Sequence, residues 1–280
     1  MEPITDLLQY DFLRHAFLAG TIVAVTAGVV GYFVVLRHLA FAGHALAHIG
    51  FTGATGAMLV GADLVVGMAV FTTGAAIAIG LLGDRLRGRD VAIGAVLAFS
   101  LGLGNLFLSQ TTKLAGRATG ILFGDLLAIS ADSVITIATF GILSLAALAF
   151  AYRPLLFASI DPAVAETRGV PVRLLGIGFM VVLAVAVATS VQVVGVLLIF
   201  GLLVAPAATA QRLTARPGRA IALSVALAVV SVWSGLVLAV LVPWPPSFFI
   251  TSVSFAIYLG VVWLAPAVGS AAGWSGRLAR

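Results

Sequence analysis

Long apolar runs separated by short polar segments make up most of the chain. No charged side chain lies between Leu174 and Gln211, or between Ala220 and Gly276. A membrane-spanning helix needs roughly 20 apolar residues, and its backbone polar groups must be satisfied within the segment. The runs therefore predict membrane helices, since they lack the short apolar/polar alternation of a transmembrane barrel.

The ends of these runs predict an all-α polytopic bundle of about eight or nine transmembrane helices. A shorter apolar piece, 121–129, cannot span and is expected to be re-entrant or packed against its neighbours. The region 174–211 is expected to hold two segments, broken near Gln192–Gly195 and bent at Pro206. The expected spans are 12–36, 43–60, 64–82, 91–108, 134–151, two within 174–211, 220–241 and 248–264.

The placement of charge orients the spans. The chain contains 15 Lys and Arg residues and has a net charge of +5. With the N-terminus outside, all of these basic residues except Arg14, Lys113 and Arg117 fall on the inner side, as the positive-inside rule requires. The sequence thus predicts a cytoplasmic C-terminus and a multi-pass protein of the plasma membrane. Basic residues scattered singly between apolar runs favour no nucleic-acid partner.

The composition excludes several enzyme classes. The absence of cysteine excludes disulfides, thiol catalysis and thiolate metal ligands. Lys113 lies in no Gly-Lys-Ser/Thr phosphate loop, so the chain is not a Walker-type ATPase. No paired acids or His-Glu pair occur in a span, so no catalytic set is evident. A single permease domain over residues 1–280 is expected, with any ATP hydrolysis on a separate subunit.

Two histidines give the second span a distinct chemistry. His44 and His48 are four residues apart, and at 100° per residue Thr52 and Thr55 fall on the same stripe. Polar groups facing lipid are costly, so this stripe should face protein or a water-filled path. Two histidines at this spacing can hold one divalent metal ion. Hydrogen bonds within a helix bundle would explain the pattern equally well.

A metal ion between neutral imidazoles would need an acidic group nearby, because an unpaired buried charge is costly. Asp125, in the short apolar piece, and Asp63, at the outer end of the second span, are the candidates. Each also suits an ordinary role as a loop or interfacial acid.

The longest polar stretch covers about residues 153–173. Asp161 suits a helix cap and Pro162 a first helical turn, whereas Gly169 should end the helix soon after Glu166. The charge placement puts this stretch in the cytoplasm. It suits docking to a separate nucleotide-binding subunit, and equally a plain connecting loop.

Five stretches in this order resemble the ABC-importer permeases for manganese, zinc and iron, with similarity from 33 to 263. They are VLRHLAFAGHALAH (35–48), GILFGDLLAIS (120–130), DPAVAETRGVP (161–171), VQVVGVLL (191–198) and APAATA (205–210). The resemblance implies a permease that pairs with a second copy of itself and with two cytoplasmic ABC ATPase subunits. An extracytoplasmic metal-binding protein would deliver the metal. No cofactor would stay bound to the chain, and Zn2+ or Mn2+ would pass through it.

The resemblance also implies roles for particular residues. Asp161, Pro162, Glu166 and Gly169 fall in the segment that couples the family's permeases to their ATPases. His48 falls on the family's histidine, whereas His44 stands where the family usually has aspartate. Imidazole suits zinc and carboxylate suits manganese, so zinc is the expected cargo and manganese the next.

Two other functions are open at this point. One is an ABC permease for iron or an iron chelate. The other is an ion-coupled secondary carrier that acts alone, although carriers of this kind need an intramembrane acid. The expected spans contain no acidic residue between their ends, and the only Lys or Arg residue within them is Arg14, near the start of the first span.

Overall fold

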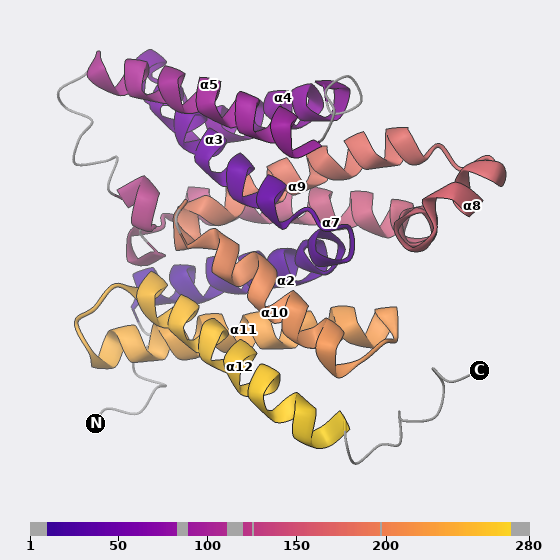
Figure 1. The fold of residues 1–280 in the computed structure, drawn as a ribbon. Coiled ribbons are helices and arrows are strands. Elements are labelled where there is room, and N and C mark those ends of the chain that lie inside the picture. The colour runs from indigo at the N-terminus through magenta and orange to yellow at the C-terminus, as the bar shows by residue number, and fades with distance from the viewer. Residues whose placement is uncertain (1–9, 83–88, 111–119, 125, 197, 270–280) are drawn as a thin grey trace.

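The computed structural model describes residues 10–82, 89–110, 120–124, 126–196 and 198–269. Within these ranges the chain forms a bundle of helices, which confirms the all-α membrane fold (Figure 1). The elements are α2 (Asp11–Leu36), α3 (Ala40–Val60), α4 (Leu64–Leu82), α5 (Arg89–Ser109), the 3-10 helix η2 (Leu126–Ala128), α7 (Ala131–Ile160), α8 (Pro162–Thr167), α9 (Val172–Val194), α10 (Ile199–Leu213), α11 (Pro217–Leu241) and α12 (Pro246–Gly269).

Seven of the described helices are long and apolar enough to cross a membrane. Neither α3 nor α10 belongs to this group, since α10 has only 15 residues and α3 is rich in Gly, Thr and His. Both are covered by other helices: α3 packs against α4, α5 and α9, and α10 packs against α2, α11 and α12. The two helices least suited to lipid therefore lie against protein.

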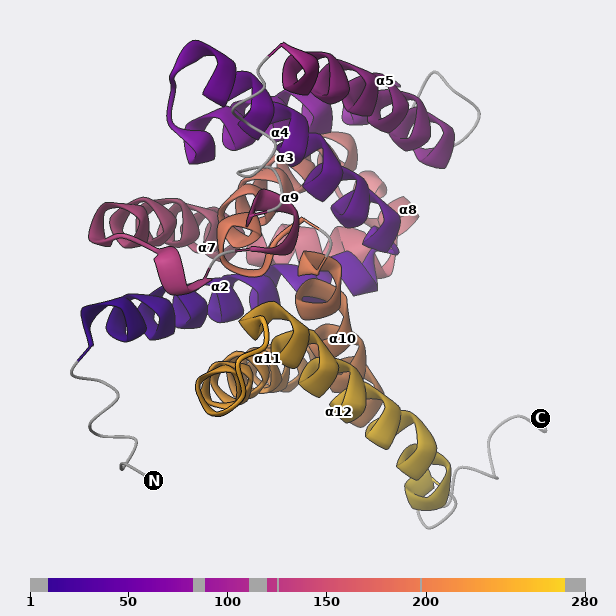
Figure 2. The ribbon, with the colours of Figure 1, turned by 90° about the vertical axis from the view of Figure 1, so that its left-hand side faces the viewer.

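The helices run between two ends of the bundle. The start of α2, η2 and the turn between α11 and α12 lie at one end, which faces the viewer in Figure 2. The turn between α2 and α3 lies at the other end, and α8 protrudes there (Figure 1). Of the described arginines, only Arg14 belongs to the first end. Those at the α8 end are Arg37, Arg89, Arg153, Arg168, Arg173, Arg212, Arg216 and Arg219.

The fifth expected span is longer in the structure than its sequence suggests. α7 continues through Pro154 to Ile160, although a polar stretch is expected from Arg153 onward. Leu155 and Ala158, three residues apart, are both buried. An apolar face thus persists beyond Arg153, and its packing holds the helix together past the proline.

Hydrogen bonds between side chains and main-chain carbonyls join several helices. Thr72 Oγ1 donates to the Ala184 carbonyl and links α4 to α9 over 3.2 Å. Gln211 Nε2 donates to the Tyr32 carbonyl over 2.8 Å and links α10 to α2. In a bundle surrounded by lipid, such bonds and the close approach of small residues hold helices together.

Two glycines explain the break between α9 and α10. Gly195 ends α9 with φ +88°, and Gly124 of the short apolar piece has φ +77°. A Cβ on either residue would overlap the backbone of the other segment. The Val196 amide donates to the Ile121 carbonyl over 3.1 Å, so the two segments also share a hydrogen bond. The predicted break near Gln192–Gly195 is confirmed.

Replacing Gly195 with alanine should destabilise the fold. The positive φ and the clash with the backbone of Phe123 together should cost at least about 2 kcal/mol. Gly178→Ala on the same helix is the matched control, because a Cβ there meets no atom within 4 Å. Thermal unfolding in detergent measures both, and equal melting temperatures would contradict the prediction.

Candidate functional site

The histidine-bearing helix α3 is held by very close contact with its neighbours. Gly53 of α3 and Gly67 of α4 face each other so closely that a Cβ on either would overlap the other's carbonyl group. Thr52 is fully buried and its Oγ1 donates to the Ser100 carbonyl of α5 over 2.7 Å. These contacts fix the rotation of α3 and so determine which way its histidines point.

The imidazoles of His44 and His48 lie together. Their ring centroids are 4.6 Å apart with an interplanar angle of 77°. The ring of His44 also packs edge-to-face with that of Phe200, at the start of α10, with centroids 5.6 Å apart. Both histidines are half-buried. Within the described ranges, neither imidazole forms a hydrogen bond or an ion pair, so ring nitrogens remain available to a ligand.

The predicted polar stripe on α3 divides into two parts. Thr52 and Thr55 are fully buried and donate to main-chain carbonyls, Thr55 to that of Thr52 over 3.0 Å. The threonine hydroxyls are therefore satisfied within the protein, whereas the histidines one and two turns earlier are not. Only the histidine part of the stripe has free ligand atoms.

The described acids do not join the histidine pair. Asp63 is exposed and caps α4 by accepting from the amides of Val65 and Val66, over 2.9 and 3.1 Å. At a rise of about 1.5 Å per residue it lies roughly 20 Å along the helix axis from His48. Asp125 lies outside the described residues. Among the described residues, no cluster of three or more His, Cys, Asp or Glu could hold a metal ion.

The segment from Asp161 to Gly169 forms a short helix, as its residues predict. Asp161 Oδ1 accepts from the Val164 amide over 3.0 Å and caps α8, and Pro162 is its first residue. Gly169 follows the helix with φ +78°. Within α8 only Ala165 is buried, and the side chain of Glu166 is exposed. The six-residue helix thus presents nearly all its surface outside the bundle.

A groove of about 660 Å³ runs beside α8. Its walls come from α8, from the start of α9 and from the end of α4, and include Glu166, Gly169, Arg173, Ile177 and Leu81. The elements that form these walls, α8, the start of α9 and the end of α4, lie at the α8 end of the bundle (Figure 1). This groove and the protruding helix can together receive an element of a partner protein.

Sequence reasoning missed two residues near these sites. Phe200 lies in an apolar run, and no local signal in the sequence places it against His44. Arg37 directly follows the first expected span, and in the structure its guanidinium Nη1 donates to Ser159 Oγ over 3.1 Å. Its position just before the histidine-bearing span was the one available signal.

Comparison with known proteins agrees with this architecture. The pattern of the ABC 3 transport family matches residues 9–265. The manganese transport system membrane protein MntC of Listeria innocua is 32% identical over 234 residues, which cover 83% of each chain. The high-affinity zinc uptake system membrane protein ZnuB of Buchnera aphidicola is 28% identical, over 85% of this chain and 92% of its own.

Solved structures show the same fold. PsaBC from Streptococcus pneumoniae, solved in complex with a Fab, superposes with a TM-score of 0.84 at 29% identity, over 94% of this chain and 95% of the other. A putative metal-chelate type ABC transporter in an inward-facing conformation superposes with a TM-score of 0.69 at 16% identity, and shows the fold alone.

The bundle and these similarities define a multi-pass membrane protein of the plasma membrane, of the class that forms the membrane part of a transporter. The chain belongs to the ABC 3 transport family. The resemblance seen in the five sequence stretches is confirmed.

Removing the cap of α8 should loosen that helix. Asp161→Ala loses the hydrogen bond to the Val164 amide, and loss of an N-cap costs about 1 kcal/mol. Asp161→Asn keeps an acceptor at the same place and is the matched control. Hydrogen exchange of the Val164 amide should be faster by about fivefold in the alanine variant only. Equal exchange in the two variants would contradict the capping role.

Proposed function

We propose that this chain is the permease subunit of an ATP-driven importer of a divalent transition metal. The observation that carries the proposal is the His44–His48 pair, whose nitrogens have no described protein partner. Because α3 is otherwise packed against α4, α5 and α9, the pair supplies polar ligand atoms within a mainly apolar bundle. Relatives named for manganese and zinc transport support the same class of cargo.

The proposal assigns the energy source to other chains. Two cytoplasmic ATPases would dock on α8 and its groove through Asp161, Pro162, Glu166 and Gly169. Nearly all the described arginines lie at this end, which supports a cytoplasmic position for it and an outside N-terminus. An extracytoplasmic metal-binding protein would then deliver the ion at the opposite end.

A second copy of the chain would complete the path. His44 is half-buried, and the neighbouring Phe200 and Phe41 keep 37% and 46% of their surface exposed. A single chain therefore leaves one side of the histidine pair uncovered. A second permease against this side would shield the ion from lipid.

The ligand chemistry and the names of the relatives point to different metals. Two imidazoles favour zinc over manganese. Several relatives are named for manganese, among them MntC of Listeria innocua and ScaB of Streptococcus pneumoniae, at 32% identity each. We assign zinc as the first cargo and manganese as the second, on the ground that His44 is part of this chain's own ligand set.

The alternative functions have less support. The described acids lie at helix starts or in α8, so no carboxylate is found within the core of a described span to couple transport to ions. They are Asp11, Asp63, Asp90, Asp132, Asp161 and Glu166. For an iron or iron-chelate cargo, the chelate transporter at 16% identity shares only the fold.

Loss of a histidine should abolish uptake. In proteoliposomes with the complete complex, His48→Ala should lower metal uptake by more than about tenfold. Even the loss of a residue that only hydrogen-bonds to a metal ligand lowers metal affinity or activity by about that much. His15→Ala, on α2 and away from α3, is the matched control. Uptake at the normal rate by the double variant His44→Ala, His48→Ala would remove the metal role.

Exchange of one ligand should change metal preference. His44→Asp introduces a carboxylate, which manganese prefers to imidazole. When the two metals compete, the ratio of manganese uptake to zinc uptake should rise by about tenfold, the change expected from exchanging a single ligand. His44→Asn, of similar shape but uncharged, is the control. An unchanged ratio in the aspartate variant would count against His44 as a ligand.

A further inference from the structure

Arg37 occupies an unusual position for a cation. It lies at the end of α2, and its guanidinium is inserted between α7 and α9. Nη1 donates to Ser159 Oγ over 3.1 Å, and the guanidinium carbon lies 5.7 Å from the centroid of the Phe179 ring. A Cβ on Gly176 would be only 3.6 Å from Nη2. Arg37 thus touches the last turn of α7 and the first turns of α9.

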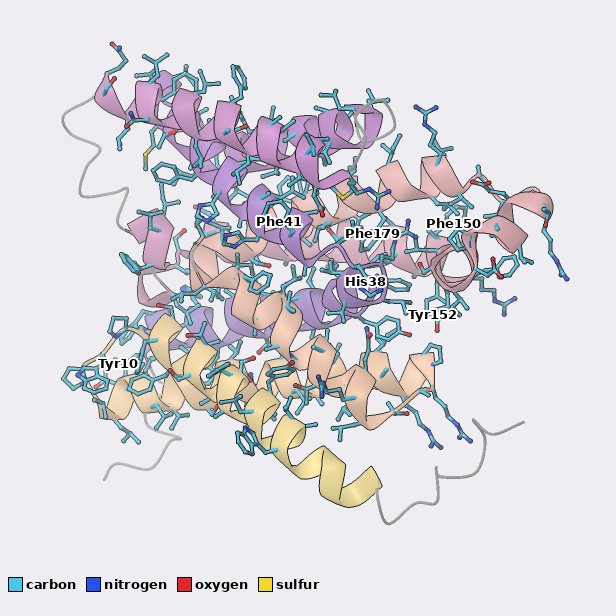
Figure 3. The ribbon with its side chains drawn as sticks, viewed as in Figure 1. Tyr10, His38, Phe41, Phe150, Tyr152 and Phe179 are labelled. Atoms are coloured by element: carbon cyan, nitrogen blue, oxygen red, sulfur yellow. The ribbon has the colours of Figure 1, made fainter. Side chains whose placement is uncertain are left out.

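These two contact regions flank α8 in the chain. Ser159 precedes the cap Asp161 by two residues, and α9 begins at Val172, shortly after α8 ends at Thr167. The end of α7 and the start of α9, which we call the two supports of α8, are therefore both in contact with the Arg37 side chain. In Figure 3, His38 and Phe179 lie at the same end of the bundle, next to the region from which α8 protrudes.

The same residue stands directly before α3. The Leu39 amide donates to the Val34 carbonyl over 2.8 Å, and the His38 amide to the Val35 carbonyl over 3.2 Å. With His38 at φ +55°, this is a Schellman ending of α2. The turn is closed by hydrogen bonds, so a shift of Arg37 carries the start of α3 with it. His44 follows one turn after Ala40, the first residue of α3.

Arg37 is not a residue that the stability of the fold favours at this position. Its Nε is buried with no hydrogen-bond partner in the structure, and the one described salt bridge, Arg14–Asp11, lies at the other end of the bundle. Burial, and to a lesser degree the charge of Arg89, lowers the pKa of Arg37. The residue as a whole is half-buried and has no acidic partner among the described residues, so its charge loses part of its hydration without an ion pair to offset the loss. Stability alone does not explain the residue.

We infer that Arg37 is a positioning residue that links the two supports of α8 to the start of α3. A displacement of α8 would move the ends of α7 and α9, and the guanidinium would transmit it to the helix that bears His44 and His48. The inference rests on the proposed function for its purpose, although the contacts themselves do not depend on it. It adds a role for a residue outside both the proposed metal-binding pair and the proposed docking segment.

The test measures transport per ATP. The complete complex, with its ATPases, is reconstituted with Arg37→Gln, and zinc uptake and ATP hydrolysis are measured in the same vesicles. Hydrolysis should persist, while zinc moved per ATP falls by about fivefold, within the range for residues that connect distant sites. Ser159→Ala removes the hydrogen bond but keeps the contact with Phe179, so it should give a smaller loss.

Arg212→Gln is the matched control. Arg212 also lies at the α8 end and over an aromatic ring, that of Tyr258, at 5.8 Å. It is exposed and stands at the end of α10, away from the supports of α8. Its substitution should leave zinc moved per ATP unchanged. An equal loss in Arg212→Gln and Arg37→Gln would overturn the inference, and so would no loss in Arg37→Gln.

A second measurement separates the inference from the proposed function. In the wild-type complex, trapping the ATPases with nucleotide and vanadate should change hydrogen exchange at the amides of residues 42–44. This change should be lost in Arg37→Gln and kept in Arg212→Gln. If the Arg37→Gln complex does not assemble, the same measurement is made on Ser159→Ala and Arg37→Lys. A wild-type change in hydrogen exchange at residues 42–44 in both variants would overturn the link. A wild-type complex that moves no divalent metal overturns the proposed function, while the exchange result still decides the link.

Discussion

Water is absent from the core of a bilayer, and this constraint determines where the polar groups of the protein can lie. Several hydroxyl and amide side chains inside the bundle donate to main-chain carbonyls of neighbouring helices, as Thr52 does to Ser100 and Thr72 does to Ala184. The imidazoles of His44 and His48 have no such partner in the described chain. They differ in this from the threonines of the same helix, whose hydroxyls are satisfied within the protein.

The histidine helix can exist only because other helices cover it. α3 is too polar to be among the seven helices suited to a lipid environment, and its glycines let α4 approach at Gly53 and Gly67. Small residues thus serve two purposes here: they allow close packing, and they leave room for the few large polar side chains. The chemistry of the site and the packing of the bundle are therefore features of one helix.

Hydropathy was sufficient to predict the long helices, because exclusion from water acts on each segment by itself. The span 64–82 agrees with α4 at both ends, and the local chemistry of Asp161, Pro162 and Gly169 correctly predicted α8. Contacts between distant segments were not predictable in this way. The approach of Gly124 to Gly195 and the contact of Phe200 with His44 depend on how helices are arranged in space.

The candidate site was predictable only in part for the same reason. The helical period placed His44 and His48 side by side, and their rings do lie together. The role of Asp63 as a helix cap needed the structure, because an acid after a glycine-ended helix could equally turn toward the histidines. Arg37 shows the limit most clearly, since its partner Ser159 is far away in the sequence.

The construction of α8 has a consequence for the kinetics of association. A helix of six residues has little intrinsic stability, and ordering a flexible chain loses about 1–2 kcal/mol of conformational entropy per residue. Here the aspartate cap, the proline and the terminal glycine shape the helix before any partner arrives. A partner of the proposed kind would need to order little of this segment on binding, so its association and release would be fast.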